Sequence, residues 1–383
     1  MANYLVTVSF CILFAFSSCK KDDLTAKLIP TILDKEVPGD LKINQLQYLG
    51  SHNSYRIKTD QEILDFLLGI ANLLPAEYNP VELDYTHLPL REQFTKYGIR
   101  QIELDLFLDQ SGGLYYSRKG NAFYDKEEAS GITELQAPGI KILHIADVDF
   151  NSHQLTFTKN LLEIKNWSNN FPEHLPIFIL LELSEKTVNT TLPNVGFAVP
   201  ESWSSEAALL SIETEILNVF DRSSIIKPDD VRGTYASLNE AVLNHNWPSI
   251  DEARGKVMFL LNNDDLSPFY TLNAPSLENR LMFTNNSNPG ADDAAFLSRS
   301  VTQLQEINAL SEAGYMIRTR VDAGTYEARN NDYSSWLTAT QSGAHFLSTD
   351  YYKADDRAGD GNWSFYHVKF NNNLYQLNPI TAY

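Results

Sequence analysis

The sequence predicts a single-domain α/β fold of the (β/α)8 TIM-barrel type over residues 43–353. Eight short apolar runs follow one another along the chain, segments of helical length separate most of them, and each run ends in polar residues. Parallel strands joined by helices produce this layout in a closed barrel, with the chemistry collected at the carboxyl ends of the strands. No change in composition interrupts the series, so one domain is expected.

The expected elements can be assigned in chain order. Strands are expected at residues 46–49, 99–107, 140–145, 176–183, 256–263, 280–285, 314–320 and 343–350. Helical patterns are expected at 156–169, 205–220, 292–313 and 333–342, and Gly98 is expected to end the helix before the second strand. Residues 354–383 are rich in aromatic residues and asparagine, and we expect them to form a C-terminal cap.

Residues 60–74 are too apolar for a helix with one apolar and one polar face. Such a segment is usually part of the core, which is the first interpretation. The alternative is an exposed ridge that enters lipid, because exposed apolar patches mark binding surfaces.

The N-terminus carries an export signal. Residues 4–16 are almost continuously apolar and lead into Ser17, Ser18 and Cys19. This run is too short to remain in a membrane as a spanning helix. The small residues before the cysteine resemble a bacterial lipoprotein signal, which predicts a signal peptide over 1–18, a lipidated Cys19 and a tether over 19–42. An ordinary signal peptide with an incidental cysteine is the alternative. Lipidation would anchor the exported protein in the bacterial cell envelope, at the outer membrane or cell surface.

Composition excludes several classes of function. The chain has 383 residues, 43% of them hydrophobic, and a formal charge of −19, which argues against nucleic acid as a partner and makes a metal cation the more natural one. Both cysteines, Cys11 and Cys19, lie in the first twenty residues. The folded body can therefore hold no disulfide, zinc–thiolate site or cysteine nucleophile.

The second expected strand carries two acidic residues on the same face. Ile102, Leu104 and Leu106 alternate with polar residues, so Glu103 and Asp105 share one face. In an antiparallel sheet that face would be exposed to solvent. In a parallel barrel it faces inward, where two buried carboxylates need a cation.

Polar residues with catalytic and metal-binding chemistry stand at the ends of the first four expected strands. They are His52 and Asn53 on the first strand, Glu103 and Asp105 on the second, His144 on the third, and Glu182 on the fourth. The amide and the three carboxylates form an oxygen-only set that suits a hard cation such as Ca²⁺ and not zinc. Two histidines beside that cation could share proton transfer.

At these residues the chain resembles the phosphatidylinositol-specific phospholipases C, and most closely their calcium-dependent bacterial branch. The resemblance covers about residues 44–353. It rests on the motifs Ser51-His52-Asn53-Ser54-Tyr55, Ile102-Glu103-Leu104-Asp105, His144, Glu182, Asn166-Trp167-Ser168, Pro172-Glu173-His174-Leu175-Pro176, Arg318-Thr319-Arg320-Val321-Asp322, and residues 342–350, in this order. Any one of these motifs is weak, whereas the ordered set is fairly specific.

The resemblance implies an enzyme that cleaves phosphatidylinositol, or a related inositol phospholipid, to diacylglycerol and inositol (cyclic) phosphate. It implies that His52 and His144 are the acid–base pair. It further implies that Asn53, Glu103, Asp105 and Glu182 bind Ca²⁺. Arg318 or Arg320 could hold the phosphate or inositol hydroxyls, but either could equally pair with barrel carboxylates.

Two departures limit what the resemblance implies. Eukaryotic members carry lysines on the fifth strand that hold ring phosphates, whereas this chain has Leu260-Leu261-Asn262-Asn263. Recognition of a polyphosphorylated headgroup is therefore not expected. The bacterial branch often has a lysine two residues after the strand-four glutamate, and Ser184 stands in that place here.

Two other functions compete with this hypothesis. Glycerophosphodiester phosphodiesterases share two histidines and a Glu-x-Asp pair, but their opening motif is His-Arg-Gly, and here Asn53 and Ser54 follow the histidine. A non-catalytic, surface-anchored barrel that binds lipid or glycan would also fit the N-terminal signal and the aromatic C-terminal segment.

Overall fold

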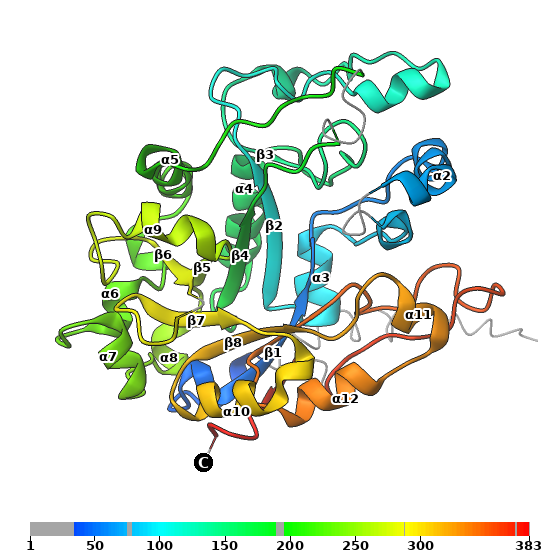
Figure 1. The fold of residues 1–383 in the computed structure, drawn as a ribbon. Coiled ribbons are helices and arrows are strands. Elements are labelled where there is room, and N and C mark those ends of the chain that lie inside the picture. Colours follow the sequence, from blue (N-terminus) through cyan, green and yellow to red (C-terminus); the bar gives the residue numbers. More distant parts are fainter. Residues whose placement is uncertain (1–33, 75–78, 189–194, 287, 372–373, 383) are drawn as a thin grey trace, which may run out of the picture.

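The computed structural model describes residues 34–74, 79–188, 195–286, 288–371 and 374–382. Within them, eight parallel strands form a closed ring, which confirms the predicted barrel (Figure 1). In ring order the strands are β1 (Leu46–Ser51), β2 (Gln101–Phe107), β4 (Ile177–Leu183), β5 (Val257–Leu261), β6 (Met282–Asn285), β7 (Ala294–Ser298), β8 (Met316–Arg320) and β9 (Phe346–Thr349). The ring closes between β1 and β2 through one residue pair, Gly50 with Gln101.

Apolar residues fill the barrel and the layer between strands and helices. A group of aromatic rings stacks inside: the centroid of the Tyr48 ring lies 4.8 Å from that of Phe178, which lies 4.6 Å from that of Phe346. These rings close the barrel as a packed core, so it is not a channel. Polar chemistry is thus restricted to the carboxyl ends of the strands.

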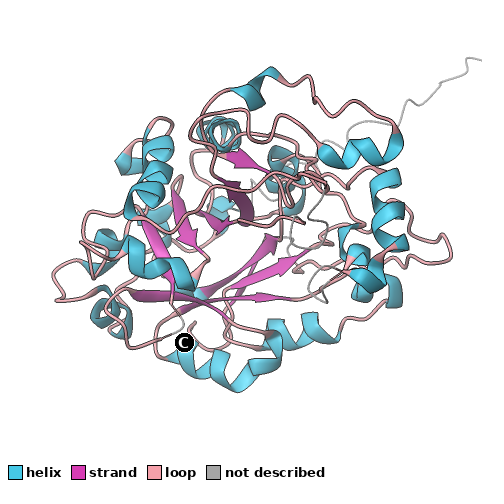
Figure 2. Cartoon of the chain, turned by 45° about the horizontal axis from the view of Figure 1, so that its top comes forward, coloured by secondary structure: helices cyan, strands magenta, loops and turns pink. Residues whose placement is uncertain are grey.

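Helices surround the strands on the outside (Figure 2). They are α2 (Gln61–Gly69), α3 (Leu90–Tyr97), α4 (Phe157–Asn170), α5 (Glu206–Leu217), α6 (Pro228–Arg232), α7 (Leu238–Leu243), α8 (Ile250–Ala253), α9 (Ser267–Tyr270), α10 (Leu304–Glu312), α11 (Tyr326–Asn330) and α12 (Ser334–Gln341). The 3-10 turns are η1 (Asp34–Glu36), η2 (Ile43–Gln45), η3 (Ala71–Leu73), η4 (Pro80–Leu83), η5 (Lys119–Tyr124), η6 (Thr133–Gln136), η7 (Arg222–Ser224), η8 (Asp264–Leu266) and η9 (Val301–Gln303).

Local signals explain where several helices start and stop. Thr156 caps α4 by accepting a hydrogen bond from the backbone N–H of Lys159, and Ser205 caps α5 in the same way through Ala208. Gly98 ends α3 in the left-handed conformation, with φ of 66°, as the sequence predicted.

Two of the expected elements were assigned wrongly. Residues 140–145 do not form the third barrel strand. They contribute only β3 (Lys141–Ile142), which pairs antiparallel with the end of β2, outside the ring. Residues 294–298, expected at the start of a helix, form the barrel strand β7 instead. The run Ala-Ala-Phe-Leu is short and fully buried, and the period of such a run does not distinguish a strand from a helix.

The segment 60–74 folds as α2 followed by η3. Ile63, Leu64 and Leu67 are buried in a small apolar cluster beside the barrel, whereas Leu68 and Leu73 are exposed, Leu73 by 74% of its surface. This segment is therefore core on one face, and its entry into lipid stays a prediction.

Both ends of the described chain pack on the barrel. Residues 34–42, at the end of the expected tether, include the buried Asp34, whose carboxylate pairs with Arg100 and accepts from the backbone N–H of Leu175. Near the other end, β10 (Tyr375–Leu377) pairs antiparallel with β1. The predicted signal peptide and Cys19 lie outside the described residues. In the described part of the chain, no helix has the length and apolar character to cross a membrane.

Candidate active site

The turn after β1 is fixed by the two serines of the opening motif. Ser51 Oγ donates to Gln93 Oε1 at 2.7 Å, and Gln93 Nε2 donates to the Ser54 carbonyl at 2.7 Å. Ser54 and Glu103 exchange two hydrogen bonds, from Ser54 N–H to the Glu103 carbonyl at 2.9 Å and from Glu103 N–H to Ser54 Oγ at 2.8 Å. These bonds attach the turn to β2 and α3. His52 and Asn53 are thereby held at the mouth of the barrel.

Asn53 has φ of 47°, in the left-handed region that asparagine tolerates better than most residues. It is 2% exposed. The turn therefore needs this residue type for its backbone as well as for its amide, which lines the cavity described below.

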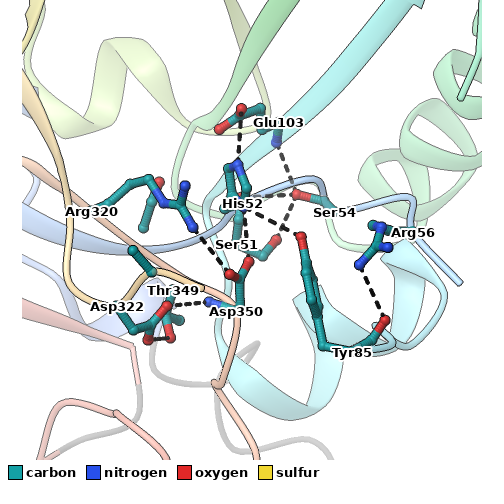
Figure 3. Close-up of polar contacts among 12 residues, drawn as sticks. Ser51, His52, Ser54, Arg56, Tyr85, Glu103, Arg320, Asp322, Thr349 and Asp350 are labelled. Atoms are coloured by element: carbon teal, nitrogen blue, oxygen red, sulfur yellow. Dashed lines mark hydrogen bonds and ion pairs between the residues drawn. The ribbon is translucent and has the colours of Figure 1, made fainter. Parts of the chain in front are cut away.

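His52 is held by a carboxylate from the far end of the chain (Figure 3). Its Nδ1 lies 2.9 Å from Asp350 Oδ1, and the other oxygen of Asp350 accepts from Arg320 at 3.1 Å. With Nδ1–H bonded to Asp350, Nε2 carries the lone pair and faces Glu103 at 3.7 Å. Burial lowers the pKa of His52 well below its usual value, and the positive charge of Arg320 adds to the shift. At neutral pH this imidazole is a neutral base.

His144 is held in the same manner by a second carboxylate. Its Nδ1 lies 2.7 Å from Asp149 Oδ2, and that oxygen also accepts from Arg56 Nε at 3.0 Å and Nη2 at 2.7 Å. The backbone N–H of His144 donates to the Asp149 carbonyl, which closes a tight loop after β3. Burial lowers the pKa of His144 to about 4, against the opposing effect of Asp149.

The two histidines thus have the same kind of support. Each imidazole donates to an aspartate, and that aspartate accepts from an arginine. Tyr85 lies between the two units. Its hydroxyl is 3.4 Å from His52 Nδ1, and the guanidinium carbon of Arg56 lies 4.4 Å above its ring. Each imidazole is held in orientation by a buried ion pair and exposes its second nitrogen.

The acidic residues of β2 and β4 lie side by side in the barrel mouth. Asp105 and Glu182 are paired positions of the two neighbouring strands. Both oxygens of Asp105 are buried and receive no hydrogen bond of ordinary geometry from the described residues, although the Tyr55 hydroxyl is near enough to oppose the rise in the pKa of Asp105. Burial raises the pKa of Asp105 well above its usual value, with Glu103 and Glu182 adding to the shift and Lys186 opposing it. Burial raises the pKa of Glu182 as well.

The negative charge of Glu103 is compensated by an arginine on the opposite side of the barrel mouth. Although burial by itself would raise its pKa, Arg318 on β8 lowers it, and Arg318 Nη2 lies 2.7 Å from Glu103 Oε2. Glu182 accepts from Asn262 Nδ2 at 2.7 Å. The acidic cluster is therefore held partly by Arg318 and an amide, while Asp105 has no such partner.

This cluster has the chemistry of a site for a hard cation. Its donors are all oxygens, and two unpartnered, buried oxygens of Asp105 are costly unless a cation compensates them. Among the described residues, no three histidine, cysteine, aspartate or glutamate side chains are close enough to form a complete metal cage.

A cavity of about 270 Å³ opens between the two histidines. Its polar part is lined by His52, Asn53, Asn79, Glu82, Tyr85, His144, Lys186, Arg320 and Asp350, and its apolar part by Leu67, Leu74, Pro80, Leu83, Ile145, Val148 and Val188. Both histidines therefore face one space, and that space has a charged side and an apolar side.

The structure places each residue that the sequence singled out. His52, Asn53 and Arg320 line the cavity. Glu103 and Asp105 lie within β2, and Asp105 is paired with Glu182, which lies near the end of β4. His144 reaches the cavity from the loop after β3, and not from the end of a barrel strand as predicted. Arg318 and Arg320 pair with the site carboxylates Glu103 and Asp350.

Sequence reasoning missed the partners that hold the histidines. Asp350 ends the last barrel strand and Asp149 follows His144 by five residues, so strand-end position was a usable signal for Asp350. Lys186, four residues after Glu182, opposes the rise in the pKa of Asp105 and Glu182, a role that the sequence did not assign to it. Tyr85 and Arg56 carried no signal, because their roles depend on contacts between distant segments.

Two carboxylate-held histidines beside an oxygen-only acidic cluster, at the carboxyl end of a parallel barrel, are an arrangement typical of barrel enzymes. The chain belongs to the family described as Phosphoinositide phospholipase C, Ca²⁺-dependent, whose model matches residues 41–379. It is thus a member of a family of phosphoric diester hydrolases.

Solved structures of a Pseudomonas enzyme agree with this fold. The calcium-dependent phosphoinositol-specific phospholipase C of Pseudomonas sp., in its apo crystal form 1, is 12% identical with a TM-score of 0.55, over 92% of this chain and 98% of that chain. Its myoinositol complex gives 12% identity and a TM-score of 0.54 over the same shares. The phosphatidylinositol-specific enzyme of Streptomyces antibioticus is 15% identical, with a TM-score of 0.45, over 82% of this chain and 95% of that one. A sequence search of curated proteins gives no match.

Proposed function

We propose that this protein is a calcium-dependent phospholipase C that cleaves phosphatidylinositol to diacylglycerol and inositol (cyclic) phosphate. The observation that carries the proposal is the shared cavity, in which two aspartate-held histidines face a charged side and an apolar side. A phosphodiester with one polar and one lipid substituent matches these two sides, because its polar part suits the charged side and its lipid part suits the apolar side. The family to which the chain belongs supports it.

The two parts of the substrate are expected to bind on different sides of the cavity. Ile145 and Val148 flank His144 and continue into the apolar wall, so the glycerol and its acyl chains belong beside His144. The inositol ring belongs on the side of His52 and Arg320. The ends of β5 and β6 present neutral amides there, with Asn285 donating to the Asn262 carbonyl and Asn262 donating to Glu182. Neutral amides suit ring hydroxyls better than several ring phosphates.

The residues that would hold Ca²⁺ are Asn53, Glu103, Asp105 and Glu182. A bound calcium ion would neutralise the charge that develops on the phosphoryl oxygens and lower the pKa of the attacking hydroxyl. Lys186, which faces the same cluster, contributes a further positive charge on this side.

The histidines divide the proton transfers between them. His52, neutral at pH 7 and with its Nδ1–H on Asp350, accepts the proton of an inositol hydroxyl at Nε2 as the hydroxyl oxygen bonds to phosphorus. His144 donates a proton to the glycerol oxygen as its bond to phosphorus breaks, which leaves a cyclic phosphate. Since burial keeps the pKa of His144 low, the negative charge of the phosphodiester must raise it when the substrate binds.

The test is turnover by the purified protein of phosphatidylinositol and of glycerophosphoinositol, with Ca²⁺ and with a chelator. Diacylglycerol should be released from phosphatidylinositol only with Ca²⁺, and His52→Ala and His144→Ala should each abolish most of the activity. Turnover of only the deacylated diester would contradict the proposal, because the apolar wall would then have no role. A folded histidine variant with full activity would remove that residue from the mechanism.

We also propose that the enzyme is a lipoprotein exported to the bacterial cell envelope. The apolar run ending in Ser17, Ser18 and Cys19 supports this proposal. Labelled palmitate should be incorporated into the full-length chain and not into Cys19→Ala. Incorporation that survives this substitution would contradict lipidation at Cys19.

A further inference from the structure

His87 is a buried histidine beside the turn after β1, and the mechanism described above does not use it. It lies in the segment between η4 and α3, and only 2% of its surface is exposed. Its Nε2 lies 2.7 Å from the backbone carbonyl oxygen of His52. Because a carbonyl oxygen only accepts, Nε2 carries a proton and donates it to this oxygen.

The charge state of His87 agrees with this hydrogen bond. Burial lowers its pKa to about 4, against the opposing effects of Asp350 and of the His52 carbonyl, so the ring is neutral at pH 7. Its Nε2 is 4.0 Å from Asp350 Oδ1, too far for a hydrogen bond, whereas His52 Nδ1 is 2.9 Å from the same oxygen. Asp350 thus binds the imidazole of His52, and His87 binds the backbone carbonyl of His52.

The ring of His87 is itself fixed by its surroundings. It stacks on the ring of Tyr352, with centroids 5.3 Å apart and planes inclined by 16°. The backbone N–H of His87 donates to the Arg56 carbonyl at 3.0 Å, and its carbonyl accepts from His153 Nε2 at 2.8 Å. The donor on Nε2 therefore has a defined position, and so has the His52 carbonyl that accepts from it.

This carbonyl belongs to the peptide unit between His52 and Asn53. The N–H groups on both sides of that unit are held by barrel strands, since His52 N–H donates to the Thr349 carbonyl at 3.1 Å and Ser54 N–H to the Glu103 carbonyl at 2.9 Å. Between them the backbone bends sharply, because Asn53 is in the left-handed region with φ of 47°. The hydrogen bond from His87 fixes the peptide unit at the bend.

A peptide unit is planar, and the Cα atoms of both its residues lie in that plane. Its orientation therefore sets the direction of the side chains of both His52 and Asn53, which are the proposed base and a proposed Ca²⁺ ligand. A buried carbonyl without a donor is costly, so without His87 this peptide is expected to rotate toward another donor.

We infer that His87 is a positioning residue, which orients the His52 imidazole and the Asn53 amide together through its hydrogen bond to the His52 carbonyl. This inference rests on the proposed function, because it takes His52 as the base and Asn53 as a Ca²⁺ ligand. His87 is not one of the described residues that line the catalytic cavity, so it acts only through the backbone.

Two substitutions of equal side-chain length separate the hydrogen bond from packing. Methionine and glutamine both remove the ring, but only glutamine can donate from the position that corresponds to Nε2. Each variant is measured for kcat and KM on phosphatidylinositol with saturating Ca²⁺, and for the Ca²⁺ concentration that gives half of the maximal increase in Tm. The second measurement does not depend on turnover.

His87→Met should lower kcat about 10- to 100-fold, with a smaller change in KM, and should raise the half-maximal Ca²⁺ concentration about tenfold or more. His87→Gln should restore most of both values. If His87→Met does not fold, His87→Asn takes its place, because its amide is one methylene shorter than that of glutamine and does not reach the carbonyl. It should then show the same two losses.

His345 provides the matched control. It is also fully buried, and its Nε2 likewise lies 2.9 Å from a backbone carbonyl oxygen, that of Asn44. It precedes β9, at the end of the barrel opposite the mouth. His345→Met should therefore lower Tm and leave both kcat and the half-maximal Ca²⁺ concentration unchanged.

Three results would overturn the role of His87 alone, given wild-type activity on phosphatidylinositol. They are equal behaviour of His87→Met and His87→Gln, equal losses in His345→Met, and a folded His87→Met enzyme in which either kcat or the half-maximal Ca²⁺ concentration matches the wild type. The last result counts because one peptide unit must affect both side chains. Absence of wild-type turnover with Ca²⁺ would overturn the proposed function and, with it, the role of His87.

Discussion

Replacing Asp350 by asparagine tests whether the carboxylate at the end of β9 controls His52. The substitution keeps size and removes the charge that accepts from Nδ1 at 2.9 Å. A hydrogen bond to a charged group is worth about 1.5–3 kcal/mol, or roughly 10- to 150-fold in rate. The asparagine amide can also donate to Nδ1 and move the imidazole proton to Nε2, where His52 must act as the base. The corresponding aspartate-to-asparagine change in a serine protease triad costs about 10⁴ in kcat.

We therefore expect Asp350→Asn to reduce kcat between about 10²- and 10⁴-fold, with a smaller change in KM. The assay is release of inositol phosphates from phosphatidylinositol at pH 7 with saturating Ca²⁺. Asp34→Asn is the matched control, because Asp34 is an equally buried, arginine-paired carboxylate at the opposite end of the barrel. The control should lose stability and keep kcat. A folded Asp350→Asn enzyme with more than half of the wild-type kcat would refute the reasoning.

Three other predictions follow from the same contacts. If His144 protonates the leaving group, His144→Ala should lose much less activity on a nitrophenyl inositol phosphate than on phosphatidylinositol, while His52→Ala loses both; equal losses would contradict this role. Asp105→Asn should raise Tm in chelator, because it removes an unpartnered buried carboxylate, and should abolish most of the Tm increase caused by Ca²⁺. Burial lowers the pKa of His345 to about 3, so between pH 6.5 and 3 the unfolded chain binds one more proton than the folded chain, and the free energy of unfolding falls as the pH falls. His345→Gln should reduce that slope by about 1.4 kcal/mol per pH unit in urea denaturation, and an unchanged slope would count against the assignment.

The barrel was predictable because most strands carry their signal locally. The run in β2 alternates apolar and polar residues, and the run in β4 is apolar except for Glu182, so both strands could be recognised without knowledge of contacts. Residues 294–298 were assigned wrongly because the period of so short a buried run does not distinguish a strand from a helix. Residues 140–145 were assigned wrongly because an apolar run does not show which strand it pairs with, and Lys141–Ile142 pairs antiparallel with β2 outside the ring.

The candidate site was also predictable only in part. His52 and Asn53 follow β1, Glu182 lies near the end of β4, and Glu103 and Asp105 alternate with apolar residues within β2. A parallel barrel brings the carboxyl ends of its strands to one face. A residue type and its place at a strand end could therefore be selected from the sequence. The charge state of each group could not, because it depends on burial and on partners from other strands.

The sequence by itself predicted the barrel and singled out the two histidines and the acidic residues that lie at its mouth. Only the tertiary structure decided how these groups are held. Asp350 reaches His52 from almost three hundred residues away, and Arg318 spans the barrel mouth to Glu103. His87 reaches the His52 carbonyl from the segment before α3. Contacts of this kind leave no periodic signal in the chain, since they depend on which strands close the ring and in which register.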